Sequence, residues 1–317
     1  MTVPLIDTLL LTAAGGDIAL SIARIMREDG LVRRIVGADA RVDHAGFAFY
    51  DDVFVLPRAD QADYPVALQT LIEREQPTIT VPVSDAELSR LLAAGLLGDG
   101  LEAGMLTANF NVLQVGLDKW LTYLRLEAAG ITTPRTGIIG ESMPDDCPFM
   151  VKPRHGQGGK GVERVEARVA AEVLAQRSGD VWQQWLPMED EEYTCGLFRV
   201  PGVALRSIIF RRKLLGGLTG SAVVVDSPVI FDALIQVAEA VDLCGSINVQ
   251  LRMHEGMPFI FEINPRFSST VGFRHRLGFQ DVVWACQHIL GRPIDSYSPA
   301  GIGTRIYRVN GEIIRPA

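Results

Sequence analysis

Residues 246–264 read SINVQLRMHEGMPFIFEIN, in which two runs rich in β-branched and aromatic residues flank a turn at 254–258. This pattern predicts a β-hairpin with strands at 246–251 and 259–264. Symmetry of the hairpin about Gly256 places Gln250 opposite Glu262, with their Cβ atoms roughly 5 Å apart. The hairpin therefore brings polar side chains from two strands to one place.

One face of this predicted hairpin is polar. Because side chains alternate along a strand, Glu262 and Asn264 share a face with Gln250, whereas Phe261 and Ile263 point to the other face. The three polar groups are hard oxygen ligands, which suit Mg²⁺, an ion that takes one or two protein carboxylates together with waters and substrate phosphates. The alternative is a buried polar set whose members satisfy one another, although burying a carboxylate with two amides and no cation is costly.

Arg266 lies two residues beyond Asn264. A guanidinium in this place would meet a phosphate or a developing negative charge. For this residue alone, an exposed ion pair is an equally good interpretation.

A second motif is the glycine-rich loop in FMVKPRHGQGGKG, residues 149–161. A strand signal at 149–152 leads into the loop, and another begins at Val162, so the loop joins two strands. This arrangement differs from the P-loop and the Rossmann turn, which need a helix after the glycines. The loop backbone can approach a ligand closely and direct amide groups at phosphate oxygens, and Lys152 and Lys160 add two positive charges. A flexible hairpin tip is the alternative. The loop glycines are Gly156, Gly158, Gly159 and Gly161.

The first hundred residues alternate strand and helix signals. Strand signals at 5–12, 34–38 and 78–84 are separated by helical patterns at 18–26 and 64–75, which predicts a parallel sheet with right-handed crossovers. The turn 13–17 with Asp39 downstream is similar to a dinucleotide-binding fingerprint, but the spacing is not GxGxxG. NAD binding here is an alternative that competes with a simple tight turn before a helix.

The rest of the chain contains a helical pattern at 117–129, with Trp120, Leu121, Leu124 and Ala128 on one side and Gly130 as the stop signal. Beyond residue 181, mostly strand signals occur, with helices near 231–241 and 281–290. The glycine-rich stretch 95–104 is interpreted as a domain boundary.

Composition limits the classes of function. The 317 residues are 48% hydrophobic and 21% charged, with a net charge of −8, which argues against a protein that binds nucleic acid through its overall field. No apolar run is long enough to span a membrane and no leader is evident, so we expect a cytoplasmic protein. The four cysteines, widely spaced without CxxC pairs, are expected to be reduced thiols.

Taken together, these motifs resemble the ATP-grasp superfamily, in particular the ATP-binding halves of the carbamoyl-phosphate synthase large subunit. The resemblance spans residues 1 to about 295. It rests on five motifs in order: Asp118-Lys119, the stretch 149–153 with its glycine loop, Gln183 to Leu186 with Glu192-Tyr193, Asn248 to Gln250, and Phe261 to Arg266. It implies a mixed α/β fold of three parts: a pre-ATP-grasp parallel α/β domain (1–105), a central and lid subdomain (106–182) and an antiparallel C-terminal lobe with the Mg-ATP site (183–317).

The resemblance also implies roles for individual residues. Lys119 and Lys152 contact the nucleotide phosphates, the glycine loop with Lys160 closes over them, and Gln184, Trp185 and Leu186 meet adenine. Glu192 holds the ribose. Gln250, Glu262 and Asn264 bind Mg²⁺, with Mn²⁺ as an alternative ion, and Arg266 and Lys152 act in phosphoryl transfer. The implied activity is that of an ATP-dependent carboxylate–amine ligase, which forms an acyl phosphate and releases ADP.

Two positions depart from the family pattern. Gln184 stands where relatives often carry glutamate, and Gln250 replaces a carboxylate, a change shared with the carbamoyl-phosphate synthase type. The chain has neither a second ATP-grasp unit nor a glutaminase-like stretch, so carbamoyl phosphate is an improbable product. Small-molecule carboxylate and amine substrates are expected as partners, an amino acid among them, without nucleic acid or membrane; a homodimer is left open.

Substrate contacts are less well defined by the sequence. An arginine pair suits a carboxylate, with solvated or ion-paired side chains as the equal alternative. The segments 84–85 and 107–111 are expected on the N-terminal side of the cleft. The substrate candidates are Arg206, Arg211, Lys213, Ser268, Ser269, Thr270, Arg274 and Arg276. A catalytically weak nucleotide-sensing module on the same fold is the second interpretation, and an NAD-dependent oxidoreductase is the third.

Overall fold

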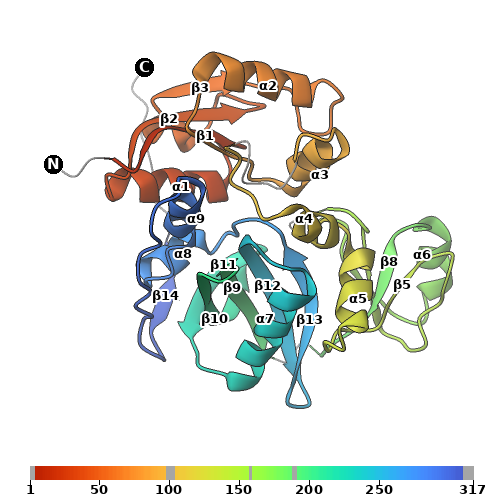
Figure 1. Ribbon diagram of the computed structural model, residues 1–317. Helices are drawn as coiled ribbons and strands as arrows, with labels where there is room; N and C mark the ends of the chain where they lie inside the picture. The colour runs from red at the N-terminus through yellow and green to blue at the C-terminus, as the bar shows by residue number, and fades with distance from the viewer. Residues whose placement is uncertain (1–3, 98–103, 157–158, 188–190, 310–317) are drawn as a thin grey trace.

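The computed structural model describes residues 4–97, 104–156, 159–187 and 191–309. Three β-sheets form the molecule: one in the N-terminal domain, one in the C-terminal lobe, and a small sheet set to one side of both (Figure 1). Within the described residues, no helix has the length and apolar character needed to cross a membrane.

The N-terminal domain contains a parallel sheet in the order β3-β2-β1-β4. The predicted strands and both predicted helices are present, but α3 was not predicted; it is capped by Ser84, whose side chain forms a capping box with Glu87. The elements are β1 (Ile6–Thr12), α1 (Asp17–Glu28), β2 (Val32–Asp39), the 3-10 helix η1 (Ala45–Ala48), β3 (Asp52–Val55), α2 (Tyr64–Glu75), β4 (Ile79–Val81) and α3 (Asp85–Ala93).

The turn between β1 and α1 has a structural explanation. Both carboxylate oxygens of Asp39 accept backbone N–H groups, from Gly15 at 2.9 Å and from Arg41 at 3.0 Å. Asp39 therefore stabilises the turn at 13–17, the turn whose sequence is similar to a dinucleotide-binding fingerprint.

The small sheet is antiparallel, in the order β5-β8-β6-β7. Strand β6 has the predicted bounds, and β7 follows the glycine loop as expected for a strand–loop–strand hairpin. Strand β8 crosses the predicted boundary at residue 182, and we propose that this subdomain ends after Gln184. Its elements are β5 (Thr136–Ile138), β6 (Phe149–Lys152), β7 (Glu163–Val165), α6 (Ala170–Gln176) and β8 (Val181–Gln184).

The C-terminal lobe is a six-stranded antiparallel sheet in the order β13-β12-β9-β10-β11-β14. Helix α7 covers one face, while α8 and α9 lie between this lobe and the N-terminal domain (Figure 1). The elements are β9 (Glu192–Val200), β10 (Ala204–Leu215), β11 (Leu218–Val224), α7 (Pro228–Ala240), β12 (Gly245–His254), β13 (Met257–Asn264), α8 (Val271–Arg276), α9 (Asp281–Ile289) and β14 (Arg305–Tyr307).

The predicted hairpin is β12–β13, and Gln250 does pair with Glu262. The turn, however, consists of Glu255 and Gly256, both at positive φ, so the strands are symmetric about a point between them. A β-bulge restores the predicted pairing, because Phe261 is an extra residue between Ile260, which pairs with Leu251, and Glu262. The prediction that Phe261 points away from Glu262 is wrong: both line the same cleft, while Ile260 and Ile263 are buried in the core behind the sheet.

The predicted helix at 117–129 is present as α5 (Lys119–Ala128), and it is preceded by α4 (Phe110–Gly116), which was not predicted. The two helices separate at Asp118, whose carboxylate caps α5 by accepting the N–H groups of Trp120 and Leu121. The predicted apolar face is wrong. Leu121 and Leu124 are 38% and 37% exposed, and α5 instead buries Thr122 and Leu126.

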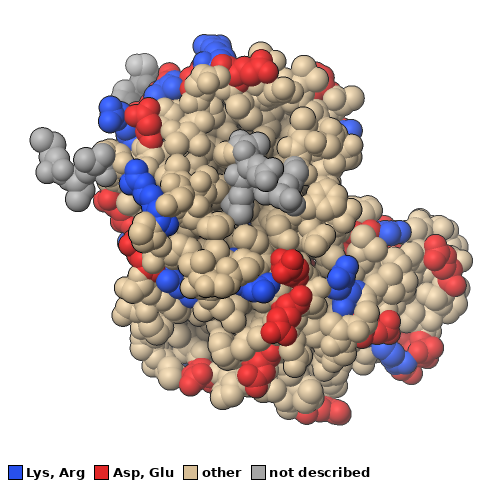
Figure 2. Space-filling model, viewed as in Figure 1, with Lys and Arg blue, Asp and Glu red and all other residues tan. Residues whose placement is uncertain are grey.

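The N-terminal domain and the C-terminal lobe share a hydrophobic core. Leu9 of β1 belongs to the same buried cluster as Phe198 of β9 and Trp284 of α9. At the surface, Arg276 of α8 forms a 3.0 Å ion pair with Glu28 of α1. The described charged side chains of both signs are interspersed on the face shown in Figure 2.

Candidate active site

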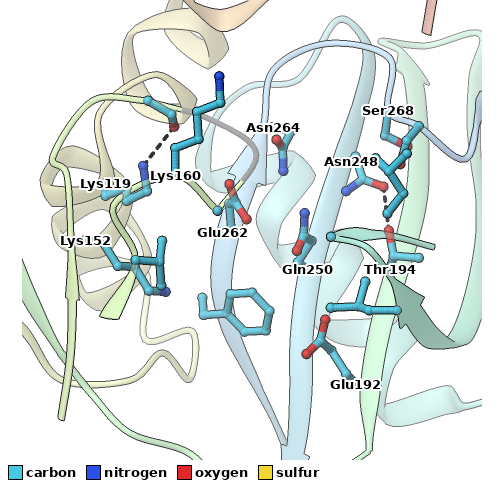
Figure 3. Close-up of a pocket in the computed structure, with 18 of the residues that line it drawn as sticks. Lys119, Lys152, Lys160, Glu192, Thr194, Asn248, Gln250, Glu262, Asn264 and Ser268 are labelled. Carbon is cyan, nitrogen blue, oxygen red and sulfur yellow. Dashed lines mark hydrogen bonds between the residues drawn. The ribbon is translucent and has the colours of Figure 1, made fainter. Parts of the chain in front are cut away.

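A cavity of about 580 Å³ lies where the three sheets meet (Figure 3). Most residues singled out in the sequence line it, although Gly161 does not, and Gly158 lies outside the described residues. The predicted residues in the cavity wall are Lys119, Lys152, Gly156, Gly159, Lys160, Gln184, Trp185, Leu186, Glu192, Gln250, Glu262, Asn264, Arg266, Ser268 and Ser269.

Lys152 is the last residue of β6 and reaches the cavity from the small sheet. Its Nζ donates a 2.6 Å hydrogen bond to Gln183 Oε1 on the paired strand β8 and lies 5.2 Å from the centre of the Phe261 ring. Burial lowers the pKa of Lys152 to about 8, an effect that the nearby Glu262 carboxylate opposes. Lys152 is partly buried, and among the described residues its hydrogen-bond partner is a neutral amide, so its ammonium is suited to receive an anionic ligand.

This pKa predicts a pH dependence of nucleotide binding. A phosphate group binds the protonated ammonium, and in the free protein Lys152 loses its proton as the pH rises through about 8. We therefore expect the affinity for ADP to be level below about pH 8 and to fall above it, by up to about tenfold per pH unit. Calorimetric titrations between pH 7 and 10 measure this, and the Lys152→Met variant should show no such decline; an equal decline in both proteins would contradict the assignment.

The glycine loop is anchored to the start of α5. Arg154 pairs with the Asp118 carboxylate at 2.8 Å, and Lys119 Nζ donates a 3.0 Å hydrogen bond to the Gly156 carbonyl (Figure 3). Gly156, Gly159 and Gly161 have φ values of 135°, 69° and 71°, a region that side chains with a Cβ rarely adopt. The loop therefore needs glycine for its backbone path, and Lys119 is held beside it. Gly161 instead turns outward, with its carbonyl accepting a 2.9 Å hydrogen bond from Arg177.

The connection after β8 forms the base of the cavity. Gln184 extends the pairing with β5, since its N–H donates to the Arg135 carbonyl at 2.7 Å. Leu186 is buried, and Trp185 packs against Arg164, whose guanidinium carbon is 4.4 Å from the ring centre. An apolar wall of this kind suits a flat heterocycle.

Two arginines that the sequence analysis did not select hold Glu192 at the cavity wall. Arg212 Nη2 lies 2.6 Å from Glu192 Oε1, and Arg252 Nη2 lies 2.6 Å from Oε2. Arg212 also donates to Gln250 Oε1 at 2.7 Å. The available signal was the strand alternation of β10: if Arg212 faces the cavity, then Arg211 and Lys213 must face away. Arg211 indeed forms an exposed ion pair with Glu191, and Lys213 is exposed.

This alternation predicts very different stability effects for two adjacent arginines. Arg212→Met removes hydrogen bonds to two partly buried groups, so we expect the free energy of unfolding to fall by about 2–3 kcal/mol. Arg211→Met removes an exposed pair and should change it by less than about 1 kcal/mol. Urea unfolding of both variants measures the difference, and similar losses in the two proteins would contradict the orientation of β10.

The donor set fits a divalent cation. Glu262 supplies an anionic oxygen, and Gln250, directly opposite in the ladder, and Asn264, two residues along, supply amide oxygens on the same cavity wall (Figure 3). Gln250 Oε1 accepts from Arg212, and Asn264 Oδ1 accepts from Arg266 at 3.2 Å. Each amide oxygen has a second lone pair, which remains for a metal. One carboxylate with neutral oxygens is typical of Mg²⁺ sites completed by substrate phosphates and water.

Arg266 lies at the border between the C-terminal lobe and the N-terminal domain. Its Nε is 2.6 Å from the Asp85 carboxylate at the start of α3. Ser84, Ser268 and Ser269 line the cavity nearby. This part of the cavity is therefore lined by both domains.

The other substrate candidates do not reach the cavity. Arg206 packs over the Trp284 ring at 4.2 Å, and Arg276 pairs with Glu28 at the surface. Arg274 is completely buried behind the sheet, in an ion pair with Asp281, and Thr270 is buried beside Ser268. The segment 107–111 also lies elsewhere, since Asn109 is hydrogen-bonded to Cys244 at the start of β12. The predictions for these residues, and for Arg211 and Lys213, are wrong because proximity in sequence to a motif does not set the direction of a side chain.

Comparison with known proteins agrees with this architecture. Residues 117–270 match the family model described as the ATP-grasp domain. An N5-carboxyaminoimidazole ribonucleotide synthetase in complex with ADP superposes with a TM-score of 0.73 and 15% identity, covering 96% of this chain and 81% of that chain. The corresponding enzyme from Staphylococcus aureus with ADP gives a TM-score of 0.71 and 16% identity over 93% and 79% of the two chains. L-amino acid ligase from Bacillus licheniformis superposes with a TM-score of 0.67 and 16% identity, covering 90% of this chain and 74% of that chain. These similarities confirm the predicted fold.

Proposed function

Residues 117–270 form an ATP-grasp domain, and from this premise we propose that the protein is an ATP- and Mg²⁺-dependent ligase that joins a small carboxylic acid to an amine and releases ADP and phosphate. One observation carries the proposal: Glu262, Gln250 and Asn264 share a cavity wall with Arg266 and face the lysines of the small sheet. Two of the similar structures contain ADP, and a third is named an L-amino acid ligase, which supports this class of reaction.

In this proposal the nucleotide lies between the small sheet and the C-terminal lobe. Adenine packs between Leu186 and Phe261, and the backbone of Trp185 and Leu186 meets the base. The ribose reaches Glu192. The phosphates pass Lys152 and lie under the glycine loop, where Lys119 and Lys160 neutralise charge.

The proposed chemistry requires positioning and charge neutralisation rather than a protein nucleophile. A carboxylate oxygen of the acid attacks the γ-phosphorus, the bond to the β-phosphate oxygen breaks, and ADP leaves with that electron pair. The amine nitrogen then attacks the acyl carbon and loses a proton, and phosphate departs. A bound Mg²⁺ supplies neutralisation of the developing phosphate charge. Arg266, held by Asp85, orients the transferred phosphoryl group.

Hydroxylamine tests this proposal without knowledge of the natural amine, because it intercepts an acyl phosphate. The full chain is incubated with Mg-ATP, hydroxylamine and each member of a panel of amino acids and short carboxylates, and ADP and hydroxamate are measured. We expect one acid, or a few related acids, to give both products in equal amounts. Tight ADP binding without turnover on any acid would instead favour the nucleotide-sensing module.

A further inference from the structure

The side chain of Asn248 is held in one orientation by two hydrogen-bond donors. Thr194 Oγ1 on β9 donates to Asn248 Oδ1 at 2.8 Å (Figure 3), and Arg274 Nη2 donates to the same oxygen from behind the sheet. Arg274 is 0% exposed, so this contact is fully buried. A guanidinium has no acceptor, and therefore the atom facing Arg274 must be the amide oxygen.

This arrangement determines which atom of Asn248 faces the cavity. The amide oxygen has two lone pairs, and Thr194 and Arg274 take both. Asn248 lines the cavity, and the contacts of the described residues leave its Nδ2 without an acceptor. The group offered to a ligand is thus an N–H donor, which suits an anion and does not suit a metal ion.

Arg274 is itself rigidly placed. Its Nη1 lies 3.1 Å from Asp281 Oδ2, which also accepts a 2.7 Å hydrogen bond from Ser246. A Cβ on Gly196 would come within 2.9 Å of Arg274 Nε, so a glycine in β9 makes room for the guanidinium. The ion pair is thereby fixed against the back of β9 and β12.

Other donors gather beside Asn248. Asn264 lies opposite it in the hairpin ladder, is 5% exposed, and has an Nδ2 atom with no hydrogen-bond partner among the described residues. Ser268 also faces this place, and Arg266 donates to Asn264 Oδ1. In Figure 3, Asn248 and Ser268 lie on the far side of Gln250 and Asn264 from the three lysines. An anion that accepts from Asn248 would therefore lie apart from phosphates held by those lysines.

We propose that Asn248 donates a hydrogen bond to the carboxylate of the acid substrate, and that Arg274 is the positioning residue that holds the amide in this orientation. The inference rests on the proposed ligase function and specifies its acid site. It requires that the site recognise the acid through an amide donor, because the proposed function assigns Arg266, the arginine beside Asn264 among the described residues, to the phosphoryl group.

Acetate, the smallest carboxylate with a methyl group, is the probe. The ¹⁵N-labelled full chain is saturated with Mg-ADP and titrated with acetate, and the Asn248 side-chain amide signal is identified by its loss in Asn248→Asp. This substitution is isosteric and keeps an oxygen for Arg274. We expect acetate to shift the Asn248 signal, and Asn248→Asp to weaken acetate binding by at least about tenfold, with the ADP dissociation constant unchanged within about twofold. Asn111→Asp, the same change at an exposed position, is the matched control.

The positioning role is tested with Arg274→Lys, which keeps the charge beside Asp281 but cannot also reach Asn248. If Arg274→Lys does not fold, Thr194→Val provides the same test, because it removes the other donor to the Asn248 amide oxygen. Both should weaken acetate binding and leave ADP binding unchanged; full acetate affinity in a folded variant of either kind would overturn the positioning role. An Asn248 signal that does not move with acetate, or a loss of ADP affinity in Asn248→Asp, would overturn the donor assignment. Because the titration involves no turnover, absence of ligase activity in the wild type would refute the proposed function separately.

Discussion

Glu262→Ala is expected to lower acid-dependent ADP release by on the order of 10³-fold or more while the protein remains folded. Glu262 is the only carboxylate among the predicted metal-binding residues, and its partners there are the amides of Gln250 and Asn264. Without it, the cavity wall offers only neutral oxygens to a divalent cation, and Mg²⁺ affinity depends on ligand charge. ADP release by a coupled assay and Mn²⁺ binding by electron paramagnetic resonance should fall together.

The matched control for this prediction is Glu239→Ala, which removes an exposed carboxylate from α7 on the other side of the same sheet. It should keep wild-type activity and metal binding. Turnover at the wild-type rate in Glu262→Ala would refute the metal assignment, and a lowered unfolding midpoint in that variant would show that the loss of activity comes from the fold.

Lys152→Met is expected to raise the dissociation constant of ADP by about 10- to 100-fold, the range of one charge-assisted hydrogen bond. Methionine keeps the length and apolar stem of the side chain beside Phe261 but removes the ammonium. Because Lys152 is partly buried at the end of β6, a solvent ion replaces its charge at the phosphates only poorly. Isothermal titration of ADP measures the effect.

Lys213→Met is the control, because Lys213 is an exposed lysine that points away from the cavity. Its ADP affinity should equal that of the wild type. Equal affinities in all three proteins would show that Lys152 does not contact the nucleotide phosphates.

The hairpin at 246–264 shows what could be predicted from the sequence and what could not. Strand type and the pairing of Gln250 with Glu262 could be predicted because residue type and hairpin symmetry are local properties. The bulge at Phe261 could not, since no local signal separates a five-residue turn from a two-residue turn followed by an extra residue. Two errors of one residue cancelled from Glu262 onward, whereas strict alternation puts Phe261 and Ile260, on the turn side of Glu262, on the wrong faces.

The direction of charged side chains required tertiary information. Strand β10 carries three basic residues in succession, 211–213, which are equally close in sequence to the active-site motifs. Only the alternation of side chains along the strand could have shown that Arg212 faces the cavity and its two neighbours do not. Arg274 could not have been placed from sequence, because an arginine in a short helix is usually solvated. Arg274 is buried here because it forms an ion pair with Asp281 and donates a hydrogen bond to Asn248, and because Gly196 has no side chain in the space that the guanidinium fills.

The bulge in β13 also has a consequence for insertions and deletions. Phe261 is one residue more than a regular ladder needs, and its neighbours Ile260 and Glu262 already pair with the adjacent residues Leu251 and Gln250. Removing Phe261 would therefore close the ladder into a regular hairpin, with Ile260 and Ile263 still in the core and Glu262 still in the cavity. Removing Glu262 would restore the same regular ladder with Phe261 opposite Gln250, but at the loss of the carboxylate from the cavity. Removing Ile260 or Ile263 would instead shift side chains between faces. Position 261 is thus the place in this strand where the chain can lose a residue and keep both its fold and the Glu262 carboxylate, giving up only the aromatic wall of the cavity.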